Sequence, residues 1–119
     1  MIGPTNPDPD TLSPRRYAAV IALKPDQIER YKQLHAEVWP EVLAQIERSD
    51  IRNYSIHLTH LHGHDYLFSY FEYHGSDFEA SMALMAQDEA TQRWWTLTAA
   101  CQQPVYGDSW HFMETVFAI

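Results

Sequence analysis

The sequence lacks most of the features that mark secreted, membrane-spanning or nucleic-acid-binding proteins. It has a single cysteine, Cys101, so no disulfide can form within the chain, and a lone thiol suits a reducing compartment. It has 8 Lys and Arg against 16 Asp and Glu, and the net charge of −8 disfavours binding to nucleic acid or to an anionic membrane. No apolar run approaches the roughly 20 residues that cross a bilayer. We therefore expect a soluble cytoplasmic protein with neither nucleic acid nor membrane as a partner.

The first residues differ in composition from the rest of the chain. Residues 1–15 contain four of the seven prolines, almost no large apolar side chains, and no apolar stretch of the kind found in a signal peptide. The whole chain of 119 residues is 45% hydrophobic, which is enough for one packed core. We expect a flexible leader over residues 1–15 and a single domain over residues 16–119, with Cys101 as a small buried apolar side chain.

Hydrophobic patterning predicts strands in four places and a helix after the first of them. Apolar or alternating runs predict the strands, over residues 17–24, 51–59, 64–74 and 110–119. A period of 3.6 residues predicts a helix from about residue 26 to residue 46. That helix should kink or restart at Pro40, because proline cannot donate a backbone hydrogen bond to Ala36.

A second helical region follows the third strand. Ser76 and Glu79 have the spacing of a capping box, which predicts that a helix begins there. It extends to about Ala100, either as one helix or as two short helices broken near Asp88. The order β-α-β-β-α-β is that of an α+β ferredoxin-like fold, in which four antiparallel strands have both helical regions on one face.

The predicted strands are apolar on both faces, most visibly at residues 66–71 and 110–119. Helices on one side can cover only one face of such a sheet. The other face should be buried against something, and a second copy of the same sheet is the simplest solution. We therefore expect a homodimer, that is, a dimeric α/β barrel.

One stripe along the first predicted helix mixes apolar residues with candidate site residues. At 100° per residue, seven side chains share an arc of about 100°: Ile28, Tyr31, His35, Val38, Trp39, Val42 and Ile46. A histidine in the middle of such a stripe costs free energy unless it finds a hydrogen-bond partner or water. His35 is therefore either a satisfied core histidine or a functional one, and the pattern leaves both open.

Two adjacent tryptophans, Trp94 and Trp95, lie in the second helical region. Neighbouring helical residues point about 100° apart, so one indole can enter the core while the other faces a different environment. Indole faces suit the C–H faces of a sugar ring, and the indole N–H suits its hydroxyls. Simple packing and sugar binding both remain open for this pair.

Four histidines crowd the turn between the second and third strands: His57, His60, His62 and His64. No cysteine or Asp/Glu pair completes a recognised ligand spacing around them, so we expect a polar turn and no metal site. The sequence has no glycine-rich phosphate loop and no Gly-x-Ser-x-Gly motif. We expect no cofactor.

Taken together, four segments resemble the L-rhamnose mutarotase family. They are RYKQLHAEVWPEV (30–42), IRNYSIHL (51–58), DYLFSYFE (65–72) and QRWWTLT (92–98). The resemblance runs from residue 16 to residue 119, and the Y-x₃-H-x₃-W-P and Q-R-W-W motifs occur in the family's order and spacing. It implies a dimeric ferredoxin-like fold. The departures are the proline-rich leader, the His-rich hairpin and a short loop at 101–109.

The resemblance also implies an activity and a set of site residues. The activity is that of an aldose 1-epimerase acting on a monosaccharide, a 6-deoxy-hexose, with L-rhamnose first and L-fucose second. The family's general acid corresponds to His35. Its sugar-contacting positions correspond to Tyr31, Tyr54, Trp94 and Trp95.

The chemistry of mutarotation fits these residue types. Ring opening needs a proton delivered to the ring oxygen and another removed from the anomeric hydroxyl, and histidine titrates close enough to neutral pH for either task. No metal or cofactor is required. Two other classes stay open: a cofactor-free monooxygenase or haem-binding protein on the same barrel, with His35 as base or axial ligand, and a non-catalytic sugar-binding module.

Overall fold

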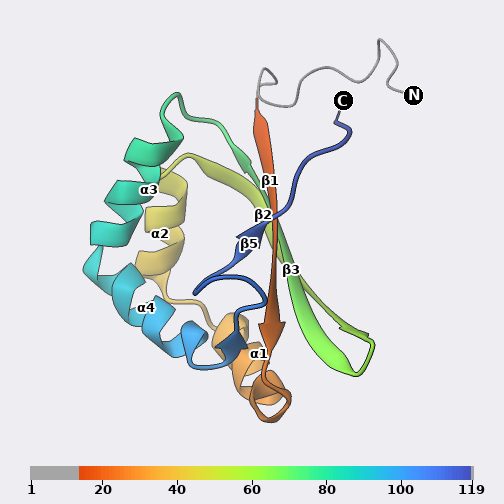
Figure 1. The fold of residues 1–119 in the computed structure, drawn as a ribbon. Helices are drawn as coiled ribbons and strands as arrows, with labels where there is room; N and C mark the ends of the chain where they lie inside the picture. Colours follow the sequence, from red (N-terminus) through yellow and green to blue (C-terminus); the bar gives the residue numbers. More distant parts are fainter. Residues whose placement is uncertain (1–13, 119) are drawn as a thin grey trace.

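A single antiparallel sheet forms the centre of the fold (Figure 1). The computed structural model describes residues 14–118, so nearly all of the expected leader lies outside the described residues. The strands are β1 Arg15–Leu23, β2 Ile51–Leu61, β3 His64–Tyr73, β4 Gln102–Gln103 and β5 His111–Phe112. Their order is β2-β3-β1-β4, and β5 also pairs with β1. This arrangement confirms the predicted α+β ferredoxin-like fold.

The hairpin between β2 and β3 closes with a two-residue turn. Leu61 pairs with His64, and the two residues between them, His62 and Gly63, have φ angles of 51° and 80°. Positive φ at both central positions is the geometry whose twist matches that of paired strands, and glycine adopts it at no steric cost. The predicted hairpin is therefore confirmed.

The first helical region is two helices rather than one. A 3₁₀ turn, η2 Pro25–Gln27, leads into α1 Ile28–Ala36, and α2 Pro40–Arg48 follows after a short break. Pro40 is the first residue of α2, where its missing N–H costs nothing, and Trp39 before it is extended, with ψ of 135°. The predicted restart at Pro40 is confirmed.

The second helical region is also a pair, α3 Phe78–Gln87 and α4 Glu89–Ala99. Asp88 separates them and begins α4, because its carboxylate accepts hydrogen bonds from the backbone N–H and the hydroxyl of Thr91. The predicted capping box at Ser76 is wrong. Asp77 caps α3 instead, accepting from the N–H of Ala80 at 3.1 Å, and a carboxylate is the better acceptor beside the positive end of a helix.

The end of the chain departs from the prediction of a strand over residues 110–119. Only His111–Phe112 forms a strand, opposite Val20 and Ala19 of β1, and the N–H of Met113 then donates to the carbonyl of Ala18 at 2.7 Å. A second short strand, β4, pairs with Ala22 and Leu23 instead. The edge of β1 is thus shared between two short segments, which leaves neither of them room for ten residues. Ile119 lies outside the described residues.

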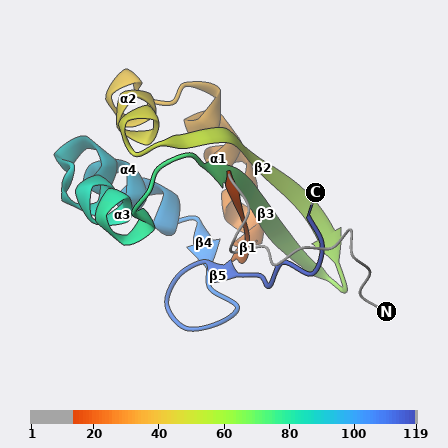
Figure 2. The same cartoon turned by 90° about the horizontal axis from the view of Figure 1, so that it is seen from above.

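The core lies between the sheet and the helices. Alternate residues of β1 face it, and Ala19, Ile21 and Leu23 are each at most 3% exposed. Cys101 is 1% exposed, which confirms that it is a buried side chain. Figures 1 and 2 show α2, α3 and α4 together on one side of the sheet.

The other face of the sheet is apolar and less covered. Ala18 and Val20 of β1 lie opposite Tyr70 and Phe68 of β3 on this face, and all four are only partly buried. Among the elements of residues 14–118, the helices pack on the opposite side. No helix within that range is long and apolar enough to span a bilayer.

Candidate active site

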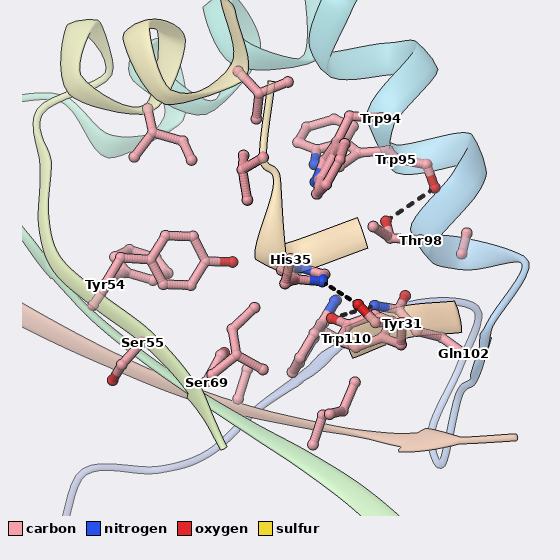
Figure 3. Close-up of a pocket in the computed structure, with 18 of the residues that line it drawn as sticks. Tyr31, His35, Tyr54, Ser55, Ser69, Trp94, Trp95, Thr98, Gln102 and Trp110 are labelled. Carbon is pink, nitrogen blue, oxygen red and sulfur yellow. Dashed lines mark hydrogen bonds between the residues drawn. The ribbon is translucent and has the colours of Figure 1, made fainter. Parts of the chain in front are cut away.

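A cavity of about 710 Å³ lies between the sheet and the helices (Figure 3). Its walls come from every helix from α1 to α4, from β1, β2 and β3, and from the segment after α4. All five side chains that the sequence predicts for a site line this one cavity: Tyr31, His35, Tyr54, Trp94 and Trp95. Residues that are 64 positions apart along the chain are therefore brought to one place.

His35 has one ring nitrogen fixed and the other available. It is the second-last residue of α1, and its Nδ1 lies 2.9 Å from the carbonyl oxygen of Tyr31 (Figure 3). A carbonyl can only accept, so Nδ1 carries a proton in both protonation states and the neutral ring has its lone pair on Nε2. Nε2 makes no hydrogen bond to any residue of 14–118. The nitrogen that can exchange a proton is thus the one left for a ligand.

Aromatic rings hold the imidazole in place. The Tyr31 ring lies against it with centroids 4.3 Å apart, and Trp94 meets it edge-on at 5.4 Å. Trp39 in turn meets Trp94 edge-on at 5.3 Å. Trp39 packs against the core and is not part of the cavity wall, whereas Val38 packs against the core and also lines the cavity.

Tyr31 is a neutral hydroxyl at neutral pH. The residue is only 5% exposed, and its oxygen accepts a hydrogen bond from Nε2 of Gln102 at 3.3 Å. Burial raises the pKa of Tyr31 to about 12, although the hydrogen bond from Gln102 acts in the opposite direction. Its phenol therefore keeps its proton and can donate it to a ligand.

Tyr54 faces the cavity from a bulge in β2. Arg52 pairs with Glu72 and Ser55 pairs with Tyr70, so two residues of β2 lie opposite one residue of β3, and Asn53 takes a φ of 51°. Figure 3 shows the Tyr54 hydroxyl pointing across the cavity toward His35. Desolvation raises the pKa of Tyr54, although 43% of the residue is exposed to solvent. Tyr54 is thus a second neutral donor.

The two adjacent tryptophans have different surroundings. Trp94 is 6% exposed and belongs to the core cluster, whereas Trp95 is 42% exposed, and both line the cavity. The 100° step between neighbouring helical residues accounts for this difference. Trp94 is therefore both core and wall, and Trp95 stands on the solvent-accessible side.

A model of the L-rhamnose mutarotase family matches residues 16–119. The chain belongs to this family. It is 35% identical to the L-rhamnose mutarotase of Bacillus subtilis over 81 residues, which is 68% of this chain and 73% of that protein. It is 34% identical to the L-rhamnose mutarotase of Listeria monocytogenes over 84 residues, 71% of this chain and 76% of that one. Both confirm the family that the motifs predict.

A solved structure agrees with the sequence comparisons. The crystal structure of an L-rhamnose mutarotase from Formosa agariphila superposes with a TM-score of 0.66 and 25% sequence identity, covering 87% of this chain and 97% of that one. As a mutarotase family member, this chain falls among the isomerases that act on carbohydrates.

Several polar residues of the cavity wall are absent from the predicted site, and Ser69, Gln102 and Trp110 are among them. Ser69 lies on the helix side of β3 between Leu67 and Phe71 and is 7% exposed. The sequence alone could have indicated Ser69, because a polar residue at an inward position of an alternating strand is unusual. Gln102 lies in the segment predicted as a loop, and Trp110 begins the predicted strand over residues 110–119. The sequence there has no hydrophobic period from which the positions of these side chains could be predicted.

The His-rich hairpin forms no metal site among the residues that the structure describes. His57 lies 2.9 Å from the hydroxyl of Ser55, and Nδ1 of His60 lies 3.0 Å from the carboxylate of Asp65. Strand alternation places His57 and His60 on opposite faces of the sheet. The imidazoles therefore point apart and bind local partners.

Proposed function

We propose that this protein interconverts the α and β anomers of free L-rhamnose, with L-fucose as a second substrate, and that His35 and Tyr31 move the protons. The observation that carries the proposal is the geometry of His35. Its Nδ1 is bonded to a backbone carbonyl, which leaves Nε2 as the ring nitrogen for a ligand, and His35 lines the cavity together with the two neutral phenols. A single base facing two hydroxyl donors is what a ring-opening reaction without a cofactor needs.

Ring opening moves two protons in opposite directions. Nε2 of neutral His35 takes the proton of the anomeric hydroxyl, the C1–O5 bond breaks as C1=O1 forms, and the electron pair of the broken bond goes to O5. The Tyr31 hydroxyl gives its proton to O5. Tyr31 and His35 are one helical turn apart with ring centroids at 4.3 Å, so both can reach the same sugar ring.

Reclosure reverses these transfers on the other face of the aldehyde. After rotation about C1–C2, O5 attacks C1, its proton returns to Tyr31, and the imidazolium returns its proton to O1. In this half of the cycle His35 is the general acid, the role that the resemblance implies for it. The protein ends in its starting protonation state, with all atoms and charges balanced.

The remaining cavity residues would bind the sugar. Trp94 and Trp95 present indole faces and N–H donors, and the Tyr54 hydroxyl points in from the sheet. The 6-methyl group of L-rhamnose or L-fucose would lie against the apolar part of the wall. L-fucose has the same 6-methyl group and differs from L-rhamnose only in the configuration of the hydroxyls at C2 and C4. It is therefore expected as the poorer substrate rather than as an excluded one.

We infer that the protein works as a homodimer in the cytoplasm. The less covered face of the sheet carries Val20, Phe68 and Tyr70, which are partly buried, and a second copy would bury these side chains further. Cytoplasmic placement is supported by Cys101, a buried thiol in a chain without any other cysteine. Light scattering coupled to size exclusion should give twice the mass of 13.9 kDa, and a monomer at micromolar concentration would contradict the dimer.

Exchange NMR of L-rhamnose at equilibrium tests the activity. The protein should broaden or transfer saturation between the H1 signals of the two anomers at catalytic concentration, with a smaller effect on L-fucose. A sugar-binding module would shift signals without exchanging the anomers. If there is no exchange with any 6-deoxy sugar, and the protein instead shows a Soret band with haem or consumes oxygen with an aromatic substrate, the proposal is wrong and the haem or monooxygenase alternative takes its place.

A further inference from the structure

Gln102 reaches the site from the edge of the sheet. It is the first residue of β4 and pairs with Leu23 of β1, and next to it the carbonyl of Cys101 accepts from the N–H of Lys24 at 2.9 Å. Cys101 itself is 1% exposed and belongs to the core cluster, so the residue before Gln102 is packed in the core. From that strand the Gln102 amide extends to the Tyr31 hydroxyl, 3.3 Å from Nε2 to oxygen (Figure 3).

The direction of this hydrogen bond determines whether the Tyr31 hydroxyl can donate its proton to a ligand. An amide N–H can only donate, so the Tyr31 oxygen is the acceptor and its own proton is left for a ligand in the cavity. A carboxylate in the place of Gln102 would reverse the bond. The Tyr31 proton would then be held by the protein instead of being offered to the sugar.

The same bond opposes the cost of removing the Tyr31 proton. Burial makes a phenolate at Tyr31 unfavourable, and the hydrogen bond from Gln102 is the contribution that favours it. Hydrogen bonds to a charged oxygen are stronger than those to a neutral one. The Gln102 N–H therefore stabilises the state in which Tyr31 has given up its proton more than the resting state, which is the condition for accelerating a reaction.

We propose that Gln102 is a positioning residue, which orients the Tyr31 hydroxyl as the proton donor of ring opening and stabilises the phenolate that remains. This inference rests on the proposed function. In the step concerned, the O–H bond of Tyr31 breaks and an O–H bond forms at O5 of the sugar. The negative charge left on the Tyr31 oxygen is held by the Gln102 N–H until reclosure returns the proton.

Two substitutions of Gln102 distinguish a role as hydrogen-bond donor to Tyr31 from a role in packing alone. Gln102→Met removes the donor at similar size and should lower kcat for anomer exchange by about 10- to 100-fold, the range expected for one hydrogen bond to a charged group, with KM changed by less than about threefold. Gln102→Glu should lower kcat at least as far at pH 8. Gln103→Glu is the matched control, because Gln103 is the exposed next residue of the same strand.

The pH dependence of kcat distinguishes most clearly between these two roles of Gln102. In the Gln102→Glu variant, the protonated carboxyl can donate to the Tyr31 oxygen and the carboxylate cannot, so the ratio of variant to wild-type kcat should rise as the pH falls from 8 to 5. A role in packing alone gives a ratio that does not change with pH, and that result would overturn the proposal. Melting temperatures within a few degrees of wild type, measured on the same samples, confirm that the variants fold.

A readout without substrate completes the test. In protein labelled with ¹³C at the tyrosine Cζ position, the Tyr31 signal is identified by its loss in Tyr31→Phe, and its titration midpoint should be higher in both Gln102 variants than in wild type. An unchanged midpoint contradicts the inference. If wild type exchanges anomers and both variants match it, Gln102 has no part in the step while the proposed function stands. A wild type that exchanges no anomers overturns the proposed function, and the inference with it.

Discussion

The two sides of the cavity are built by different interactions. The polar side, Tyr31, His35 and Gln102, is tied together by hydrogen bonds: Nδ1 of His35 to the carbonyl of Tyr31 at 2.9 Å, and Nε2 of Gln102 to its hydroxyl at 3.3 Å. The apolar side consists of Ile51, Phe71, Met82 and Met85, and packing holds it. Proton transfer needs groups at fixed distances and directions, whereas a wall that accepts a methyl group needs only shape. The comparison predicts that changes on the polar side alter the rate and changes on the apolar side alter stability.

The largest effect is expected on the apolar side. Met85 is 6% exposed in the second core cluster, so Met85→Ala should lower the free energy of unfolding by about 2–5 kcal/mol by leaving a cavity. The rate per folded molecule should stay within about threefold of wild type. Urea unfolding at one fixed protein concentration measures the first quantity. Leu84→Ala, at a neighbour that is 60% exposed, is the control that should change little.

A loss of kcat with unchanged stability for Met85→Ala would break the comparison, because it would place chemistry on the apolar side.

The second-largest effect is a loss of catalytic rate, and it is expected on the polar side of the cavity. Tyr31→Phe keeps the ring that packs against His35 but removes the hydroxyl, so kcat for anomer exchange should fall by about 100-fold if Tyr31 is the acid. The unfolding free energy should change by less than about 1 kcal/mol. Tyr106→Phe, at a residue that is 71% exposed, serves as control. Full activity in Tyr31→Phe would leave Tyr54 as the remaining phenol for the step.

Alkaline pH should reveal the burial of Tyr31. Its pKa is about 12 in the folded protein against an ordinary value of 10.0, so the native state binds this proton more tightly than the unfolded chain. The stabilisation is complete below pH 10 and is lost as the pH rises to 12, by about 2 kcal/mol. Tyr31→Phe should show a shallower decline over the same interval in pH-dependent urea unfolding. Equal slopes would contradict the burial of the hydroxyl.

The smallest effect is expected for the tryptophan on the accessible side. Trp95 is 42% exposed, so Trp95→Ala should remove sugar contacts with little loss of stability, raising KM about tenfold. Trp94→Ala should instead lower stability, as Met85→Ala does, because Trp94 is buried in the core cluster. Sugar titrations and thermal melts distinguish the two. Thr96→Ala, at the exposed next residue of α4, is the control.

Elements with a strong period could be predicted from the sequence. The stripe through Tyr31 and His35, the restart at Pro40 and the hairpin at Gly63 all depend on neighbours within a few residues of each other, and all three are found. The spacing of Tyr31 and His35 places both in one wall of the cavity before any tertiary contact is known. The five residues that the sequence predicts for a site lie in helices and a strand that carry the family motifs, and the structure places all five in the wall of one cavity.

The features that could not be predicted are those for which several residues or segments compete for the same hydrogen-bonding position. Ser76 and Asp77 both suit a helix cap. In the structure the N–H of Asp77 donates to the hydroxyl of Tyr73, the last residue of β3, at 3.1 Å, and Asp77 is the cap. Gln102 and the segment after it have no period, and their place is set by pairing with the free edge of β1. The contact between Gln102 and Tyr31 joins residues 71 positions apart, and nothing local in the sequence indicates it.

The measurement that tests the central claim most directly is the rate of L-rhamnose anomer exchange with His35→Ala. Because Nε2 of His35 is the proposed proton carrier, exchange above the spontaneous rate should fall by about 100-fold or more. His62→Asn, at the exposed hairpin tip where asparagine tolerates the positive φ, should keep wild-type activity. Both variants should melt near the wild-type temperature. A folded His35→Ala protein that exchanges anomers at the wild-type rate would contradict the account.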